Sequence, residues 1–333
     1  MGKQLGIDLG TSKTMIYLKK QGIILCTPSV VAVERKSHSV VAVGEKASRM
    51  LGKTPGSILT LKPLCGGVIS DYEATSLMLN RLFRDIGAYS LFNRPSVTVS
   101  VPYIANEVEK RALEDAVIDA GASSVSLIPQ PAAAAIGAGL RINSPSGSML
   151  VNIGAGTTET AIISMGGIAC SRVLPIAGDD LDRAIVRYIK SNYRILIGEV
   201  TAEAIKRRIG SAHPSVSRGY LEVSGRNLIT GLTATVKVSS TEIRNAIMEP
   251  IAIILAAIKS TLENAPPELA ADIYDFGILL TGGSAVLGGL DRMISENMGV
   301  RVIVSKNPFD NVCMGIGRAV ENPEKYASFI SGH

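Results

Sequence analysis

Three glycine-containing turns that follow apolar runs are the part of this sequence best suited to chemistry. They are Asp8-Leu-Gly-Thr-Ser-Lys13, Asn152-Ile-Gly-Ala-Gly-Thr-Thr158 and Thr281-Gly-Gly-Ser284. Glycine permits a tight turn whose main-chain N–H groups, with nearby hydroxyls, can point at phosphate oxygens. A single turn of this kind is more often a plain hairpin. Three such turns have no common structural purpose, and together they predict a phosphate site.

The first polar residue differs between two of these turns. Asp8 places a carboxylate at the end of its apolar run, and carboxylates are ligands that magnesium accepts. The second turn has Asn152 instead. Asparagine keeps the shape and accepts a hydrogen bond, but it has no charge and cannot accept a proton. The residues alone leave open whether this is a working nucleotide site or one that has lost part of its chemistry.

Strand-like segments surround these turns and must position them. Leu5–Tyr17 and Gly147–Ile163 both read as strand, glycine turn and strand. They lie about 145 residues apart, which indicates an internal duplication. The third turn follows the apolar run Gly277–Leu280.

Apolar residues at helical spacing predict the helices that pack on the strands. Helices are expected over Asp71–Ile86, Ala105–Ala120, Asp180–Tyr193, Thr201–Ile209 and from Ser239 to Glu263. Four alanines after Pro131 predict a slim helix that can pack tightly against a neighbour. A hairpin turn is expected at Ser224-Gly225.

Composition limits the class of protein. The 333 residues are 46% apolar and 19% charged, which suits two domains or one pseudo-symmetric unit. Four cysteines without C-x-x-C pairing predict neither a zinc site nor disulfides, and they favour a reducing cytoplasm. Neither a signal peptide nor a membrane span is expected, because apolar stretches such as Ile251–Ile258 are short. The net charge of +5 is dispersed, so no nucleic-acid partner is expected.

Motifs along nearly the whole chain resemble those of a known family. The three turns resemble the phosphate and adenosine loops of the actin, sugar-kinase and heat-shock-chaperone ATPases. Within that group, further segments resemble the bacterial actin MreB and its close paralogues. In chain order these are Gly52-Lys-Thr-Pro-Gly56, Gly67-Val-Ile-Ser-Asp71, Val108-Glu-Lys-Arg-Ala112, Ile197-Gly-Glu-Val-Thr-Ala-Glu-Ala-Ile-Lys206, Val223-Ser-Gly-Arg-Asn-Leu-Ile-Thr-Gly231 and Pro266-Pro-Glu-Leu269.

The resemblance implies an α/β, actin-like ATPase fold with duplicated ribonuclease H-like lobes, whose four subdomains surround a nucleotide cleft. The first lobe would span residues 1–139, with an insertion subdomain at 32–66, and residues 313–333 would return to it. The second lobe would span residues 140–312, with an insertion subdomain at 181–245. ATP and Mg²⁺ are the implied cofactors.

The resemblance also assigns roles to residues. Asp8 would organise magnesium through water, and Asp8, Gln130 and Asn152 would be the catalytic positions. Glu203 and Lys206 would contact the ribose and base side of the nucleotide. The other nucleotide-binding residues would be Gly10, Thr11, Ser12, Lys13, Gly154, Ala155, Gly156, Thr157, Gly178, Asp179, Gly282, Gly283, Ser284 and Ala285.

Three positions depart from the family pattern. The family usually has Asp at Asn152, Glu at Gln130 and Asn at Lys13. Glutamine is the milder change, because glutamine orients attacking water in other NTPases. General-base help contributes ~10²–10⁴ in rate, so retained ATP binding with slow hydrolysis is expected. The alternative is ordinary turnover with compensation by neighbouring groups. Lys13 either contacts phosphate or faces solvent.

Partners are implied as well. MreB proteins place an exposed apolar loop where this chain has Leu91 and Phe92, so these side chains are expected to contact the inner face of the cell membrane. Buried packing is the alternative. The chain is expected to be cytoplasmic and peripheral at that membrane, to assemble with itself into paired protofilaments, and to work with the cell-wall elongation machinery that sets rod shape.

Two other functions use similar turns. A chaperone-type ATPase would need a peptide-binding domain or lid, whereas this chain ends soon after Gly317-Arg-Ala-Val320. A sugar kinase would need an acidic catalytic base and a sugar pocket, and neither stands out. An actin-like filament protein is the predicted function, and ATPase activity is left open.

Overall fold

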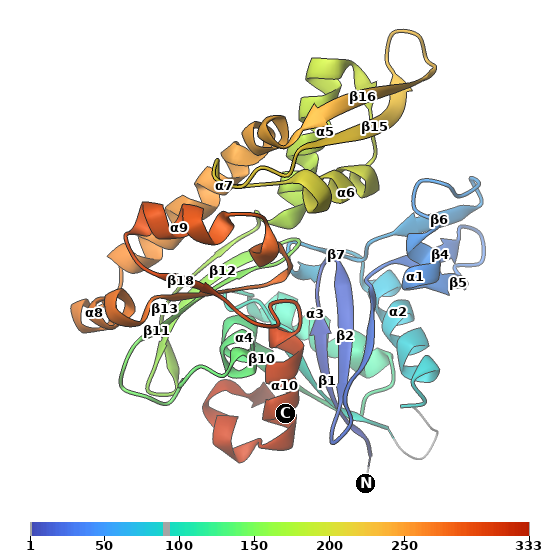
Figure 1. Ribbon diagram of the computed structural model, residues 1–333. Coiled ribbons are helices and arrows are strands. Elements are labelled where there is room, and N and C mark those ends of the chain that lie inside the picture. Colours follow the sequence, from blue (N-terminus) through green and yellow to red (C-terminus); the bar gives the residue numbers. More distant parts are fainter. Residues whose placement is uncertain (1, 89–93, 333) are drawn as a thin grey trace.

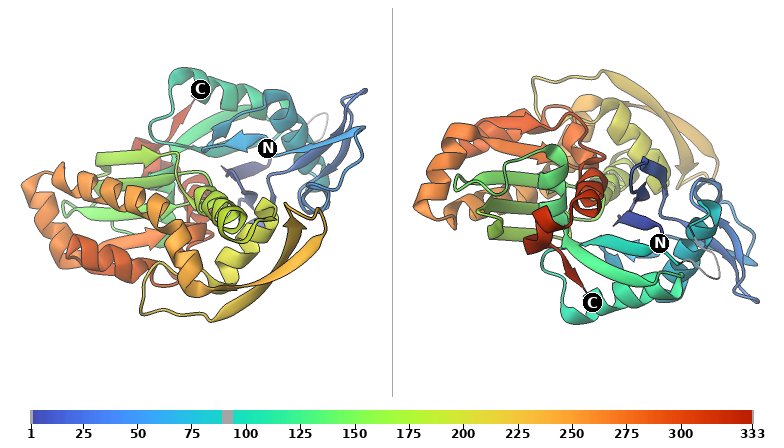
Figure 2. Two further views of the ribbon diagram at one scale, coloured as in Figure 1. Left: turned by 90° about the horizontal axis from the view of Figure 1, so that it is seen from above. Right: turned by 90° about the horizontal axis from the view of Figure 1, so that it is seen from below.

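Two sheets with the same strand order form the centres of two lobes (Figures 1 and 2). The computed structural model describes residues 2–88 and 94–332. Its larger sheet has the order β19-β10-β9-β1-β2-β3, and the other has the order β13-β12-β11-β17-β18. β1 pairs antiparallel with β2 and parallel with β9, just as β11 pairs antiparallel with β12 and parallel with β17. This match is what the predicted duplication requires.

The strands alternate between two packed faces. The first sheet contains β1 (Gln4–Leu9), β2 (Lys13–Leu18), β3 (Gly22–Pro28), β9 (Ser96–Val101), β10 (Ser124–Pro129) and β19 (Ser331–Gly332). The second contains β11 (Ser148–Ile153), β12 (Thr158–Ser164), β13 (Gly167–Leu174), β17 (Ile278–Thr281) and β18 (Val302–Val304). Leu5 and Ile7 enter the first core, and Val151 and Ile153 enter the second.

Helices cover the outer faces of both sheets. α2 (Tyr72–Asp85) and α3 (Glu107–Asp119) share the core of Leu5 and Ile7. α5 (Gly178–Tyr193), α7 (Ser240–Glu263), α8 (Pro267–Phe276) and α9 (Leu290–Met298) serve the second lobe. Capping boxes of Asn106 with Glu109 and of Ser239 with Glu242 determine where α3 and α7 begin.

α4 (Gln130–Ala138) and α10 (Asn311–Glu321) cross between the lobes. α4 leaves the first sheet and packs against β11 and β12, whereas α10 packs back against β1 and β2. A Cβ on Gly137 would collide with the main chain of Asn311, and a Cβ on Gly315 would collide with that of Ala133. The tight packing predicted for the alanine-rich helix is confirmed.

Each lobe also carries a small insertion sheet. β4 (Val31–Glu34), β5 (Val40–Val43) and β6 (Ile58–Leu61) lie with α1 (Glu45–Ser48) at the right of Figure 1. β14 (Ile195–Leu196), β15 (Tyr220–Asn227) and β16 (Thr233–Ser239) lie with α6 (Glu199–Ile209) at the top. β7 (Leu64–Cys65) and β8 (Val68–Ile69) form a separate pair. The boundaries given above for lobes and subdomains stay predictions.

The hairpin predicted around Ser224-Gly225 is present, because β15 pairs antiparallel with β16, but the predicted place of its turn is wrong. β15 continues through both residues, and the chain turns at residues 228–232 instead. A Cβ on Gly225 would lie 2.6 Å from the Leu196 carbonyl oxygen of β14. Glycine therefore serves close strand approach here, a need that depends on a strand far away in sequence.

α7 is the one helix of residues 2–88 and 94–332 that is long and apolar enough to cross a membrane. It is longer than the apolar stretches recognised in the sequence. Its buried stripe packs in the second-lobe core and consists of Ile243, Ile247, Ile251, Ile254 and Ile258. The helix therefore packs as a core helix of the second lobe, which also explains its apolar composition.

Candidate nucleotide site

The first two predicted phosphate turns are hairpin turns at matching positions of the two lobes. In the β1–β2 turn, the Gly10 N–H donates to the Lys13 carbonyl at 3.1 Å. In the β11–β12 turn, the Gly154 N–H donates to the Thr157 carbonyl at 2.9 Å. The duplication therefore extends to the hydrogen bond that closes each turn.

These two turns meet between the lobes. Thr11 is 8% exposed, and its Oγ1 accepts a hydrogen bond from the Gly67 N–H at 3.1 Å. The Ser12 carbonyl accepts from the Ser29 N–H at 3.0 Å. A Cβ on Gly156 would lie 2.5 Å from Thr11 Oγ1. Glycine at residue 156 is therefore what allows the turns to approach.

The second turn also joins the start of α5 and the third predicted loop. The Gly178 N–H donates to the Gly154 carbonyl at 3.2 Å, and the Asp179 N–H donates to the Ala155 carbonyl at 2.8 Å. Ser284 Oγ donates to the same Gly154 carbonyl at 2.8 Å. The structure thus gathers residues of three predicted segments into one cluster.

Asn152 lies against the third loop. It is 3% exposed. Gly282 has φ +90°, and a Cβ there would lie 2.7 Å from Asn152 Oδ1 and collide with the main chain of Ile153. The following short helix η1 (Gly283–Val286) contains Gly283, Ser284 and Ala285. Both the positive φ and the crowding require glycine at residue 282.

Lys13 extends from the first lobe toward the second. Its Nζ lies 5.9 Å from the centroid of the Phe309 ring, at the outer limit of a cation–π contact. A Cβ on Gly283 would lie 3.5 Å from the same ring. Lys13 is exposed and therefore stays available to a ligand.

Lys206 of α6 is held in a buried ion pair. Its Nζ lies 2.8 Å from Asp182 Oδ2 and donates to the Gly178 carbonyl at 2.8 Å. Burial raises the pKa of Asp182 to about 6, while the Lys206 ammonium opposes that increase. Glu203 is exposed on the same helix. Lys206 therefore ties α6 to the start of α5, a contact that the sequence did not predict.

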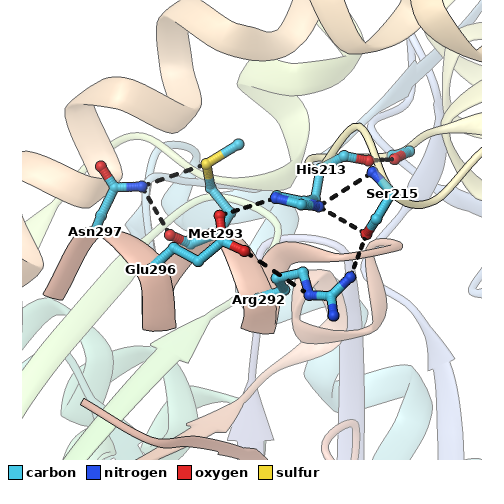
Figure 3. A network of polar contacts seen from close by, with 7 residues as sticks. His213, Ser215, Arg292, Met293, Glu296 and Asn297 are labelled. Carbon is cyan, nitrogen blue, oxygen red and sulfur yellow. Dashed lines mark hydrogen bonds and ion pairs between the residues drawn. The ribbon is translucent and has the colours of Figure 1, made fainter. Parts of the chain in front are cut away.

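A polar network fastens the loop after α6 to α9 (Figure 3). His213 Nε2 lies 3.0 Å from Glu296 Oε2, and its Nδ1 lies 2.7 Å from Ser215 Oγ. Arg292 donates to the same Ser215 hydroxyl at 2.7 Å. α9 follows η1, so the network holds the α6 side and the η1 side of the expected nucleoside position together.

Asp8, Ser100 and Gln130 lie where three parallel strands of the first sheet end. Asp8 is the residue before the last in β1, Ser100 has the same place in β9, and Gln130 follows β10 as the first residue of α4. Ser100 Oγ donates to Asp8 Oδ1 at 3.1 Å. Burial raises the pKa of Asp8 to about 6, and the Ser100 hydrogen bond opposes the rise. Ligands of α/β sheets commonly bind at such strand ends.

Glu159 was missed by the sequence analysis. It lies opposite Asn152 on β12 and is fully buried. Among the residues that the structure describes, neither of its carboxylate oxygens has a hydrogen-bond partner. Burial raises the pKa of Glu159 to about 8. The main-chain N–H of Tyr103, which faces the carboxylate without reaching full hydrogen-bond geometry, acts against this rise, and the Asp8 charge adds to it. A glutamate beside the apolar residues Ala161–Ile163 was the available signal.

The carboxylates of Asp8 and Glu159 suit a magnesium ion that arrives with phosphate. Within the described ranges, no group of three or more His, Cys, Asp or Glu side chains could hold a metal by itself. Mg²⁺ commonly uses one or two carboxylates together with water and substrate phosphates. The unpartnered oxygens of Glu159 fit that requirement.

The predicted membrane residues Leu91 and Phe92 lie outside the described residues.

Comparisons with known proteins agree with this architecture. The sequence profile described as MreB/Mbl protein matches residues 2–328. MreB of Escherichia coli (strain K12) is 47% identical over 323 residues, covering 95% of this chain and 93% of that protein. Mbl of Bacillus subtilis (strain 168) is 43% identical over 323 residues, covering 97% of each. Both are called cell shape-determining proteins.

Solved structures support the same fold. Crystal structures of MreB5 of Spiroplasma citri, bound to ADP or to AMPPNP, have a TM-score of 0.92 and 34% identity, covering 98% of both chains. A MamK double helical filament has a TM-score of 0.81 at 21% identity, covering 97% of this chain and 99% of that one, and indicates the fold alone. The predicted α/β, actin-like ATPase fold is confirmed. The chain belongs to the MreB/Mbl family.

Proposed function

We propose that this protein binds ATP, assembles with copies of itself into filaments and takes part in determining cell shape. The shape-determining names of the E. coli and B. subtilis relatives support this role, and the nucleotide-bound MreB5 structures support nucleotide binding. The observation that carries the proposal is the meeting of two equivalent hairpin turns and a third loop at one place. A triphosphate held there would contact both lobes.

The residues divide between the two ends of the nucleotide. Glu203, Lys206 and η1 take the nucleoside side, where the ion pair of Lys206 and the network around His213 hold α6 and α9 in place. Lys13 adds a positive charge at the phosphate end. The phosphate side consists of Gly10, Thr11, Ser12, Lys13, Gly154, Ala155, Gly156 and Thr157, with Gly178 and Asp179 adjoining.

Hydrolysis is proposed to be slow. When bound, Mg²⁺ would neutralise developing charge on the phosphates, and Asp8 would hold it on the first-lobe side. Gln130 can orient a water molecule through its amide but cannot take a proton. Asn152 has the same limit, so neither position supplies a general base.

Membrane and cell-wall roles are further proposals. Leu91 and Phe92 would place the filament at the inner face of the cytoplasmic membrane, which makes the protein a peripheral one. Many weakly bound loops along one filament give strong attachment overall. The partners would be the cell-wall elongation machinery.

Nucleotide titration together with sedimentation tests the proposal. We expect calorimetric binding of ATP, and pelleting of polymer that requires nucleotide. Gly156→Val should weaken nucleotide binding, because the added side chain would separate the two turns. Gly56→Val is a control, because nothing lies within 4 Å of a Cβ at that position. Absence of ATP binding by the wild type would refute the proposal, and binding without polymer would favour a chaperone-type ATPase.

A further inference from the structure

Lys13 lies on the same face of the first sheet as Asp8. Asp8 of β1 is paired with Met15 of β2, and Lys13 precedes Met15 by two residues on the same strand. Side chains two residues apart in a strand point to one face, and residues paired across antiparallel strands share a face. The Lys13 side chain therefore leaves the hairpin on the side that carries the Asp8 carboxylate.

That face is directed toward α10, the helix between the lobes. Tyr17 lies on it too, four residues after Lys13, and a Cβ on Gly317 of α10 would collide with the Tyr17 ring. Lys13 Nζ lies 5.9 Å from the centroid of the Phe309 ring, which follows β18 of the second sheet. A Cβ on Gly283 of the third loop would lie 3.5 Å from that ring. The ammonium group thus extends from the first turn toward the third loop, and the proposed nucleotide lies between these two segments.

The second turn has no cation at the equivalent position. The hydrogen bond that closes the first turn is accepted by the Lys13 carbonyl, and the one that closes the second turn is accepted by the Thr157 carbonyl. Thr157 is buried, whereas Lys13 is exposed. Of the residues assigned above to the phosphate end of the nucleotide, Lys13 alone has a positively charged side chain. Lys13 is therefore the charged donor that the two hairpins offer to phosphate.

The Lys13 ammonium is not committed to an acidic partner. Within residues 2–88 and 94–332, none of the ion pairs includes Lys13, whereas Lys206 is held by Asp182. The Phe309 ring lies at the outer limit of a cation–π contact and competes weakly with an anion. A lysine ammonium binds phosphate as a point charge on a flexible stem. Lys13 can therefore turn to a polyphosphate without breaking an ion pair of the fold.

We propose that the Lys13 ammonium binds the polyphosphate directly and supplies part of the charge neutralisation that magnesium otherwise supplies, so that this chain holds nucleotide without a divalent cation. The inference rests on the proposed nucleotide function. Asp8 and Lys13 have separate tasks, because the carboxylate would hold hydrated Mg²⁺ whereas the ammonium contacts phosphate oxygens. The Lys13 contact matters most without Mg²⁺, when the phosphates keep their full negative charge. Binding of this kind does not by itself speed hydrolysis, since it holds the ground state as well as the transition state.

Calorimetric titration of ADP in EDTA and in Mg²⁺ tests this inference on the full chain. The wild type should bind ADP in EDTA with an affinity within about tenfold of that in Mg²⁺. Lys13→Met keeps the length of the side chain and removes its charge. It should weaken ADP binding in EDTA by about 10- to 100-fold, the range of one hydrogen bond to a charged group, and less in Mg²⁺. Lys13→Arg keeps the charge and should keep the binding in EDTA.

Adenosine and a distant lysine provide the controls. Adenosine has no phosphate, so its affinity should be the same for the wild type and for Lys13→Met. An equal loss for adenosine and ADP would refute a direct phosphate contact, because the substitution would then have disturbed the site as a whole. Lys53→Met should bind ADP as the wild type does, because Lys53 is exposed in the segment between α1 and β6.

The outcomes separate this inference from the proposed function. If the wild type binds ADP in Mg²⁺ but not in EDTA, the role of Lys13 is refuted while nucleotide binding stands. The same holds if Lys13→Met keeps the wild-type affinity in EDTA. Should Lys13→Met fail to fold, Lys13→Gln takes its place, with the same expected loss. A wild type that binds nucleotide in neither buffer would instead refute the proposed function.

Discussion

Asn152 and Asp8 are side chains of the same shape that differ in one atom, an amide nitrogen in place of a carboxylate oxygen. They occupy equivalent hairpin positions, and both lie at the end of a central strand. Asp8 keeps a carboxylate held by Ser100, whereas the amide of Asn152 lies close to Gly282. Both lobes have the same hairpin turn, while only the first has an acid at this position.

Restoring that acid should speed hydrolysis. Asn152→Asp returns a negative charge and a proton acceptor, and we expect phosphate release with Mg-ATP to rise by ~10-fold or more, within the range of general-base effects. Release of inorganic phosphate under saturating nucleotide is the measurement. Asn143→Asp is the control because Asn143 is exposed. No gain for Asn152→Asp would mean that hydrolysis is not limited at this position.

Asp182 should make stability depend on pH. Its pKa is raised from 3.8 to about 6, so between these values the folded protein binds more protons than the unfolded chain. Its contribution to stability is therefore largest at low pH and falls as pH rises to about 6, by up to ~3 kcal/mol.

Urea unfolding at several pH values checks this prediction. Without nucleotide, Asp182→Asn should lose that part of the slope, whereas the exposed Asp275→Asn should keep it. Asp8 and Glu159 also have raised pKa values, but they are present in both proteins and cancel in the comparison. Parallel pH profiles for the wild type and Asp182→Asn would contradict the assignment.

At the scale of elements, the crossing of α4 and α10 is the contact most sensitive to one methyl group. Gly137 and Gly315 each bring one helix backbone against the other. In an exposed helix, Gly→Ala would stabilise by up to ~1 kcal/mol. At these two positions the added methyl group would collide with the main chain of the facing helix, which cannot move aside as a side chain could.

Gly137→Ala and Gly315→Ala should therefore destabilise the protein by about 1–3 kcal/mol, the usual cost of overpacking. Denaturant midpoints would measure this loss. Gly56→Ala serves as the control because its Cβ would meet nothing within 4 Å. Higher stability of either helix variant would show that the helices can separate without cost.

At the scale of the whole molecule, the lobes are connected on two sides of the candidate site. α4 and α10 cross on one side. On the other, Lys62 after β6 lies 3.6 Å from Glu199 at the start of α6. That ion pair is largely exposed and contributes little to stability. The helix crossing is therefore the stronger connection.

The proposed membrane attachment would depend on the assembled molecule. Leu91→Ser combined with Phe92→Ser should reduce pelleting with anionic liposomes by several-fold, since each copy along a filament loses an apolar contact. Polymer pelleting without lipid should stay at the wild-type level. Liposome pelleting equal to that of the wild type would exclude this loop as the membrane contact.

The sequence alone determined features that depend on neighbouring residues. The hairpins around Asp8 and Asn152, the capping of α7 at Ser239 and the alanine helix all follow from preferences acting over a few residues. The repeated pattern of strand, glycine turn and strand also predicted two lobes of matching topology, because similar local patterns form similar hairpins. The MreB resemblance then named residues that the structure gathers from both lobes.

Only the tertiary structure decided features that depend on distant partners. Local sequence predicts a turn at Gly225, and only the position of β14 shows why glycine is needed there. Local sequence likewise gives Glu159 as an ordinary strand residue, and only the packing of the lobe shows that it is fully buried. Likewise, Lys206 has the partner Asp182 only once α5 and α6 pack together. Burial and pairing are set by which segments meet in space, and local sequence does not contain that information.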